Sequence, residues 1–83
     1  MTLQKSSSVI GAKEMNVIGP KVREFREKQQ LTQEELVTKC NLLEWDISRG
    51  TLAKIEAQVR RVTDEEVILL AKALRVDINE LYE

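Results

Sequence analysis

Residues 47–56 read ISRGTLAKIE and carry the signals of one short helix. Ser48 is a good helix N-cap, because its hydroxyl oxygen can accept a bond from a free N–H group of the first turn. Leu52 and Ile55 are three residues apart and therefore face the same side of a helix. Gly50 costs roughly 1 kcal/mol relative to alanine inside a helix. Its presence indicates either that another molecule approaches the backbone closely there or that the position tolerates glycine.

Similar start signals occur elsewhere in the chain. A Thr or Asp followed three residues later by Glu forms a capping box, in which both side chains bond backbone N–H groups that otherwise lack a partner. Such boxes begin at Thr32, Thr63 and Asp77. Pro20 also suits the first turn of a helix, because its missing N–H group costs nothing there. These signals predict four helices, the first covering about 20–29, and a last short turn after residue 77.

Apolar residues follow each start at helical spacing and predict the buried faces. They are Ile18, Val22 and Phe25 for the first helix, Leu36, Val37 and Cys40 for the second, and Val67, Leu70, Ala71 and Leu74 for the fourth. No stretch shows a strand pattern, so we expect an all-α fold, a compact five-helix bundle. Residues 1–17 show no sustained period and contain three consecutive serines, so we expect a flexible arm there and the domain at residues 18–83.

Composition excludes several classes of protein. The chain has 83 residues, one Cys and no His, which argues against an internal disulfide, a metal cluster and the commonest general base. No apolar run approaches a membrane span, and the N-terminus lacks the apolar centre of a secretory signal. We therefore expect a cytoplasmic binding module that is not an enzyme and needs no metal or cofactor. Cys40 is expected to be a small buried apolar residue.

Four pieces of the chain, in order, resemble the Cro/C1-type (XRE) helix-turn-helix family of phage-repressor-like DNA-binding domains. The pieces are Val22-x-x-Phe25-Arg26, LTQEEL at 31–36, ISRGTLAKIE at 47–56 and LAKALRVDINEL at 70–81. The resemblance spans residues 18–83. It implies a lambda-repressor-like fold that binds double-stranded DNA sequence-specifically, with residues 48–57 as a recognition helix in the major groove.

By position in this resemblance, Arg49, Gly50, Thr51 and Lys54 would face the bases. Arg49 can donate two hydrogen bonds to the O6 and N7 atoms of guanine, which is the commonest specific contact. Lys54 lies one helical turn beyond Gly50 and reaches the same side. The alternative is a solvated helix face with ordinary charges.

Further residues are candidates for phosphate contacts or for support of the recognition helix. The free N–H groups at the start of the second helix favour a phosphate, and the resemblance assigns backbone positioning to the Gln there. The phosphate candidates are Lys21, Thr32, Gln33, Ser48, Arg60 and Arg61. The resemblance also implies an internal ion pair between Arg26 and Glu56, which would link the first helix to the recognition helix.

The chain departs from the family pattern at two places. The link NLLEWD at 41–46 makes the connection to the recognition helix about five residues longer than the usual turn of 3–4 residues. Gln58 stands where the family commonly has a helix-ending glycine, so the recognition helix would either run further or end differently. The residues expected to fold the longer link back onto the core are Leu42, Leu43, Trp45 and Ile47. An aromatic wedge or a dimer contact is the alternative role of Trp45.

The resemblance implies a homodimer on a pseudo-palindromic DNA site, with no membrane and no small-molecule ligand. Ile78, Leu81 and Tyr82 in the closing turn form the expected dimer surface. The alternative function is a protein-interaction module, antitoxin-like or a regulator subunit, that keeps the fold with weak or no DNA affinity. The pI of about 5.6 and the lengthened link favour this alternative.

The net charge of −1 hides an uneven distribution along the chain. Residues 47–62 carry four basic groups against one acidic group, a local charge of +3. Residues 63–83 carry two basic and six acidic groups, a local charge of −4. Attraction to phosphate depends on charge within a Debye length of about 8–10 Å, so the recognition helix can attract DNA although the whole chain is slightly acidic.

Overall fold

The computed structural model describes residues 15–83. This part of the chain contains no strand and forms the helices α2 (Gly19–Lys28), α3 (Gln33–Leu42), α4 (Arg49–Glu56) and α5 (Asp64–Leu74), followed by the 3-10 helix η1 (Ile78–Tyr82). The predicted all-α class is confirmed. The count of five helices is not: residues 15–83 form four α-helices, and the fifth element is a 3-10 helix. In this element the backbone bonds join residues three apart, as from the Glu80 N–H group to the Asp77 carbonyl oxygen at 2.9 Å, which is the pattern of a 3-10 helix.

The helices begin where their capping residues predict. The Thr32 hydroxyl accepts a bond from the Glu35 N–H group at 3.0 Å, and the Glu35 carboxylate accepts one from the Thr32 N–H group at 2.8 Å. The boxes that open at Thr63 and Asp77 are formed in the same way. The first helix begins at Gly19, one residue before the predicted start, with Pro20 in its first turn.

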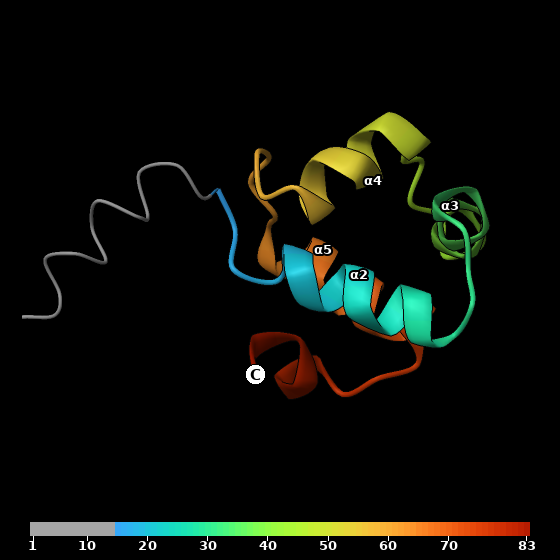
Figure 1. Ribbon diagram of the computed structural model, residues 1–83. Helices are drawn as coiled ribbons and strands as arrows, with labels where there is room; N and C mark the ends of the chain where they lie inside the picture. The colour runs from blue at the N-terminus through green and yellow to red at the C-terminus, as the bar shows by residue number, and fades with distance from the viewer. Residues whose placement is uncertain (1–14) are drawn as a thin grey trace, which may run out of the picture.

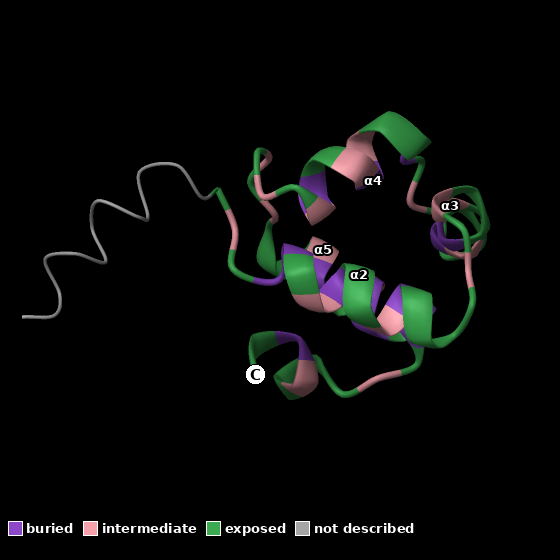
Figure 2. Ribbon diagram, viewed as in Figure 1, coloured by how far each residue is buried: buried purple, intermediate pink, exposed green. Residues whose placement is uncertain are grey.

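The helices enclose one core. Helix α2 contacts α4, α5 and η1, while α3 contacts α4 and α5 (Figure 1). The buried residues, purple in Figure 2, lie on the sides of the helices that face the core. Nearly all predicted core residues are buried, whereas Phe25 and Val37 are only partly buried and pack against the rim of the core. The core thereby holds α4 with one face inward and the other at the surface.

The lengthened link is accommodated in part by a longer α3. The helix continues to Leu42, which leaves residues 43–48 as the connection to α4. Trp45 and Ile47 pack on the core as predicted. The expectation for Leu42 and Leu43 is wrong, since 79% of Leu42 and 36% of Leu43 remain exposed. The additional turn of α3 carries Leu42 onto its outer face, away from the core.

Helix α4 stops without glycine. Gln58 adopts a left-handed backbone with φ of 65°. The N–H groups of Gln58 and Val59 then bond the carbonyl oxygens of Ile55 and Lys54, each at 3.0 Å. This satisfies the last turn as a glycine-containing stop would. The helix therefore ends at Glu56 and does not run further.

The N-terminal segment before α2 is tied to the end of α4. The Asn16 amide donates to the carbonyl oxygens of Ile55 at 3.2 Å and Arg60 at 2.8 Å, and its oxygen accepts from the Gly19 N–H group at 2.7 Å. A methyl group on Gly19 would overlap the Ile55 carbonyl oxygen, so glycine permits this close approach. The predicted flexible arm at 1–17 lies outside the described residues except for 15–17.

The closing turn differs from the expected dimer surface in one residue. Leu81 is fully buried and belongs to the core, while Ile78 and Tyr82 are exposed. Leu81 is therefore unavailable to a partner, because it holds η1 against the body of the domain. In the described part of the chain, no helix has the length and apolar character needed to cross a membrane.

Candidate nucleic-acid interface

Helix α4 presents an outward face that contains the predicted base-contact residues. Leu52 and Ile55 are fully buried, which turns the opposite side of the helix to the surface. Arg49, Gly50 and Lys54 are exposed there, whereas Thr51 is half-buried. The structure therefore brings these four residues to one accessible end of the domain, at the upper edge in Figure 1.

Arg49 is fixed by the start of α3. Its Nη1 atom donates a hydrogen bond to the Gln33 side-chain oxygen at 2.9 Å. Gln33 opens α3, so this bond joins the N-terminal turns of the two helices. Nη1 is the only guanidinium nitrogen of Arg49 with a bond to the described residues, which leaves Nε and Nη2 to act as donors outward.

Gln33 is in turn held by the predicted ion pair. Its amide nitrogen donates to Glu56 Oε1 at 3.0 Å. Glu56 accepts from Arg26 Nε at 2.7 Å and from Arg26 Nη2 at 3.2 Å, a two-point contact between α2 and α4. The third nitrogen of Arg26 donates to the Leu31 carbonyl oxygen at 2.7 Å. A continuous bonded chain therefore runs from Arg26 inside the fold to Arg49 on its surface.

The ion pair lies in the interior of the domain. The Arg26 side chain is 11% exposed and that of Glu56 is 5% exposed. Every donor nitrogen of Arg26 has a protein acceptor, and no buried polar side-chain atom lacks a partner in residues 15–83. The pair thereby joins α2 to α4 through two hydrogen bonds that are almost shielded from solvent.

Ser48 and Thr51 are occupied with the cap of α4. The Ser48 hydroxyl accepts from the Thr51 N–H group at 3.1 Å and lies 3.1 Å from the Thr51 hydroxyl. A methyl group added at Gly50 would meet only Ser48 Oγ, at an ordinary 3.9 Å. The fold itself therefore does not require glycine at residue 50, and the open space lies on the outer surface of α4.

The remaining phosphate candidates differ in their availability. Arg60 donates to both carboxylate oxygens of Glu66 at 2.9 and 3.0 Å, which lowers the pKa of Glu66 and raises that of Arg60. Lys21 forms an ion pair with Glu24 at 3.4 Å. Arg61 is exposed and forms no ion pair within residues 15–83. The positive charge of Arg60 is thus largely neutralised, while that of Arg61 is open to a ligand.

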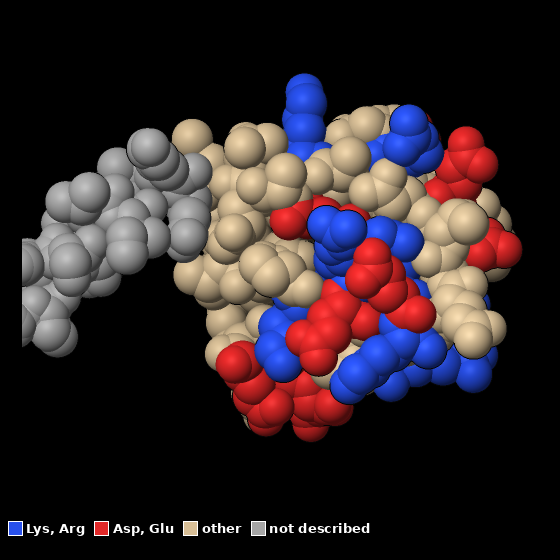
Figure 3. Space-filling model, viewed as in Figure 1, with Lys and Arg blue, Asp and Glu red and all other residues tan. Residues whose placement is uncertain are grey.

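Charge is unevenly spread over the surface. Figure 3 shows acidic atoms gathered at the lower edge, over η1, and basic atoms at the upper edge, over α4. The centre, over α2, carries both signs because its charged side chains pair with one another, as Arg23 does with Glu27 at 3.0 Å. The acidic charge at η1 therefore lies opposite the basic charge of α4. The other three acidic residues of segment 63–83 open α5 directly after the basic segment, where Glu66 pairs with Arg60.

Two contributions to this interface were not predicted. Gln33 links Arg49 to Glu56, whereas the sequence suggested only a phosphate contact for it. Asn16 holds the carbonyl groups at the end of α4 from within the predicted flexible arm. No local signal indicates this role of Asn16, because the carbonyl groups that it holds lie 39 and 44 residues away in the sequence. Nothing in the spacing of Gln33 and Arg49 indicates their contact.

Residues 22–81 match the family model described as "Helix-turn-helix", of the Cro/C1 (XRE) type. The match spans all four α-helices apart from the first residues of α2, and includes the bonded chain from Arg26 to Arg49. Comparison with curated proteins and with solved structures gives no significant match. The family consists of DNA-binding regulators and is typically non-enzymatic. The chain belongs to the Cro/C1-type helix-turn-helix family.

Proposed function

We propose that the chain is a small repressor-like transcriptional regulator that binds double-stranded DNA sequence-specifically, with α4 in the major groove. The observation behind this proposal is the exposed face of α4. Arg49 in its first turn and Lys54 in its last turn have no ion-pair partner in residues 15–83, and a buried ion pair anchors the helix to α2. An anchored helix with free donors on its exposed face has the properties needed to read base edges.

The residues of this face take different roles in the proposal. Arg49 donates two hydrogen bonds to a guanine through the donors that Gln33 leaves free. Lys54 and Thr51 contact neighbouring bases or phosphates, and Gly50 allows the backbone of α4 to approach the DNA. The proposed phosphate contacts come from the starts of α3 and α4, at Thr32, Gln33 and Ser48. Lys21, Arg60 and Arg61 are the flanking contacts.

The proposed complex contains two copies of the chain. Members of this architecture read pseudo-palindromes whose half-sites lie about one helical turn apart, so one copy would occupy each half-site. The proposal needs no cofactor and no enzymatic step, and it places the protein in the cytoplasm with its DNA.

A selection from random duplex DNA, followed by salt-dependent binding, tests this function. We expect a selected site whose affinity falls steeply as salt rises, because counterions are released where lysine and arginine meet phosphate. Arg49→Ala should cost about 1–3 kcal/mol of binding free energy and relax the preference at one base position. Lys28→Ala provides the matched control, because Lys28 is an exposed basic residue on α2, outside the proposed interface.

The second candidate is a protein-interaction module with weak or no DNA affinity. The neutralised charge of Arg60 and the acidic end of the domain favour it. Recovery of no site from the selection, or binding that ignores salt, would replace the DNA proposal with this one.

A further inference from the structure

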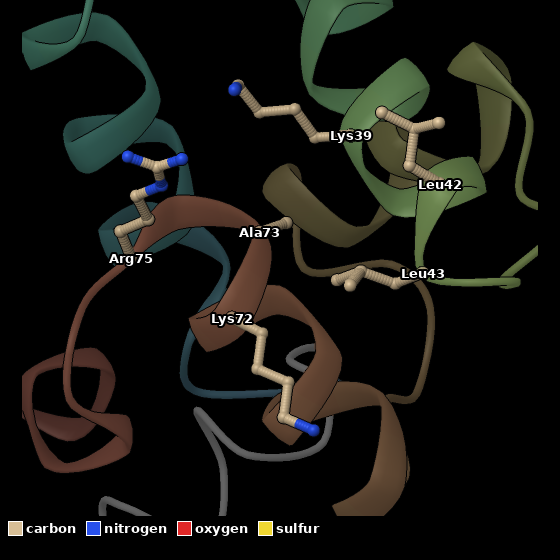
Figure 4. A pocket seen from close by; sticks show the side chains of 6 residues that line it. All are labelled: Lys39, Leu42, Leu43, Lys72, Ala73 and Arg75. Atoms are coloured by element: carbon tan, nitrogen blue, oxygen red, sulfur yellow. The ribbon is translucent and has the colours of Figure 1, made fainter.

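A hollow lies between the end of α3 and the end of α5. Lys39, Leu42 and Leu43 line it from α3 and its cap, and Lys72, Ala73 and Arg75 line it from α5 and its cap (Figure 4). None of these residues belongs to the candidate nucleic-acid interface. The hollow forms where α3 ends, because the last residue of the helix, Leu42, and its C-cap, Leu43, lie near the end of α5.

The size of the hollow suits one side chain. Its volume is about 170 Å³. Sites for small molecules usually occupy about 300–1,000 Å³ and bury most of the ligand, whereas this hollow is smaller and widely open to solvent, so that it can cover one side of a single ring. The hollow therefore fits one aromatic side chain better than a free metabolite.

The rim of the hollow is positive and its wall is apolar. Lys39, Lys72 and Arg75 form no ion pair within the described residues. Leu42 and Leu43 expose apolar surface beside these cations. A complementary ligand presents an aromatic or aliphatic group with carboxylates on either side of it.

The closing segment of the same chain has this chemistry. Tyr82 is 55% exposed, and the segment 77–83 contains three acidic residues and no basic one. Glu83 follows Tyr82 directly, and Glu80 lies two residues before it, with one carboxylate oxygen bonded to the Asp77 N–H group at 3.0 Å and the other left free of bonds to residues 15–83. Leu81 is buried and holds η1 on α2 and α5, and Tyr82 does not line the hollow of its own chain. An exposed tyrosine between carboxylates is therefore available to another molecule.

We propose that the hollow receives Tyr82 of a second copy of this chain. The ring packs against Leu42 and Leu43, and the flanking carboxylates meet the three cations of the rim. A cation close to the ring face adds to the attraction. Reciprocal insertion of two tails closes a dimer, whereas insertion in one direction only would extend an open chain. The proposed function includes a homodimer, and the present proposal names its contact surface. It therefore rests on the proposed function.

Sedimentation equilibrium of the protein without DNA tests the contact. We expect a dimer whose dissociation constant rises between 50 mM and 500 mM salt, because the rim charges become screened. Tyr82→Ala and Leu42→Asp should each raise the dissociation constant at least tenfold, as truncation of an interface anchor does. Val59→Asp is the matched control for Leu42→Asp, since Val59 is also an exposed apolar residue and lies outside the hollow. Unchanged melting temperatures verify that each variant is folded.

A mixture of two variants identifies the kind of contact. The Tyr82→Ala chain keeps an intact hollow, and the Leu42→Asp chain keeps an intact tail. Mixed in equal amounts, they should associate at least threefold more tightly than either variant alone, because one of the two insertions is restored. The proposal would be overturned if the wild type were monomeric or if both variants kept the dissociation constant of the wild type. It would also be overturned if the mixture associated no more tightly than either variant alone. DNA binding by a monomeric wild type would show that the proposed function survives without this contact.

Discussion

Replacement of Glu56 by alanine should remove a large share of the stability of the domain. The carboxylate is 5% exposed and accepts three hydrogen bonds, two from Arg26 and one from Gln33. In Glu56→Ala, the Arg26 guanidinium stays inside the fold with only the Leu31 carbonyl oxygen as a strong acceptor. The nearly buried positive charge then keeps only the distant counter-charge of Glu27, whose Oε2 atom lies 3.9 Å from Arg26 Nη2 on a side chain that is 55% exposed.

The expected magnitude follows from this burial. Breaking one partner of a buried ion pair costs about 3–5 kcal/mol, and domains of this kind have a total free energy of unfolding of about 5–15 kcal/mol. We expect the lower part of that range, about 3 kcal/mol, because Arg26 remains slightly exposed and keeps one carbonyl partner. For a small domain that loses about 1 kcal/mol of stability per molar urea, the unfolding midpoint would fall by about 3 M.

Urea unfolding followed by circular dichroism measures this loss. The control is Glu27→Ala, which removes an ion pair between the side chains of Arg23 and Glu27, 63% and 55% exposed. It also removes the long 3.9 Å contact of Glu27 with Arg26, but it leaves the Arg26–Glu56 pair intact. An exposed pair such as that of Arg23 and Glu27 contributes about 0.2–1 kcal/mol. Equal midpoints for Glu56→Ala and Glu27→Ala would refute the reasoning.

A double variant separates the lost counter-charge from the lost volume. Arg26→Met combined with Glu56→Leu replaces the pair with apolar side chains, which often restores stability after a buried ion pair is removed. We expect this variant to be more stable than Glu56→Ala. The base preference of Glu56→Ala, measured by selection at a temperature where it is folded, should change less than its stability does.

Further predictions concern the thiol and two glycines. Burial raises the pKa of the Cys40 thiol to about 11, so iodoacetamide at pH 8 should label it only in urea, as read by mass spectrometry. Labelling of the native protein at the unfolded rate would contradict its burial. Gly19→Ala should lower stability by about 1–3 kcal/mol in the same urea assay, because its methyl group would overlap the Ile55 carbonyl oxygen. Gly50→Ala should raise stability by up to about 1 kcal/mol, since its methyl group meets only Ser48 Oγ at 3.9 Å. Equal effects of the two substitutions would count against the close approach of Gly19 to the Ile55 carbonyl oxygen.

The local signals in the sequence predicted the elements well. The boxes at Thr32 and Thr63 depend on residues only three positions apart, so they can be recognised without knowledge of the fold, and both are formed. The buried face of α5 follows from helical spacing in the same way. The Arg26–Glu56 pair was predicted only from the family resemblance, because thirty residues separate its members.

The errors concern residues whose environment depends on how the helices pack. Leu42 was expected in the core because it is apolar, yet the extension of α3 turns it to solvent. Leu81 was expected at a dimer surface together with Ile78 and Tyr82, yet it is fully buried in the core. Gln58 shows that a residue other than glycine can take the left-handed conformation when its side chain gains a contact, here a bond to the Asn16 carbonyl oxygen at 3.1 Å. In each of these cases, contacts with residues distant in the sequence contribute to the environment of the side chain.

The hydrogen bond between Gln33 and Arg49 bears on the entropy of DNA binding. Fixing a long side chain such as arginine costs up to about 2 kcal/mol of rotamer freedom. Because Gln33 already restrains Arg49 in the free protein, part of this loss precedes any encounter with DNA. In the proposed function, substitution of Arg49 alone would also leave the Gln33 oxygen without this donor. To change the base preference, residues 33 and 49 would therefore need to be substituted together, so that the bond from the side chain of residue 33 to Glu56 is kept.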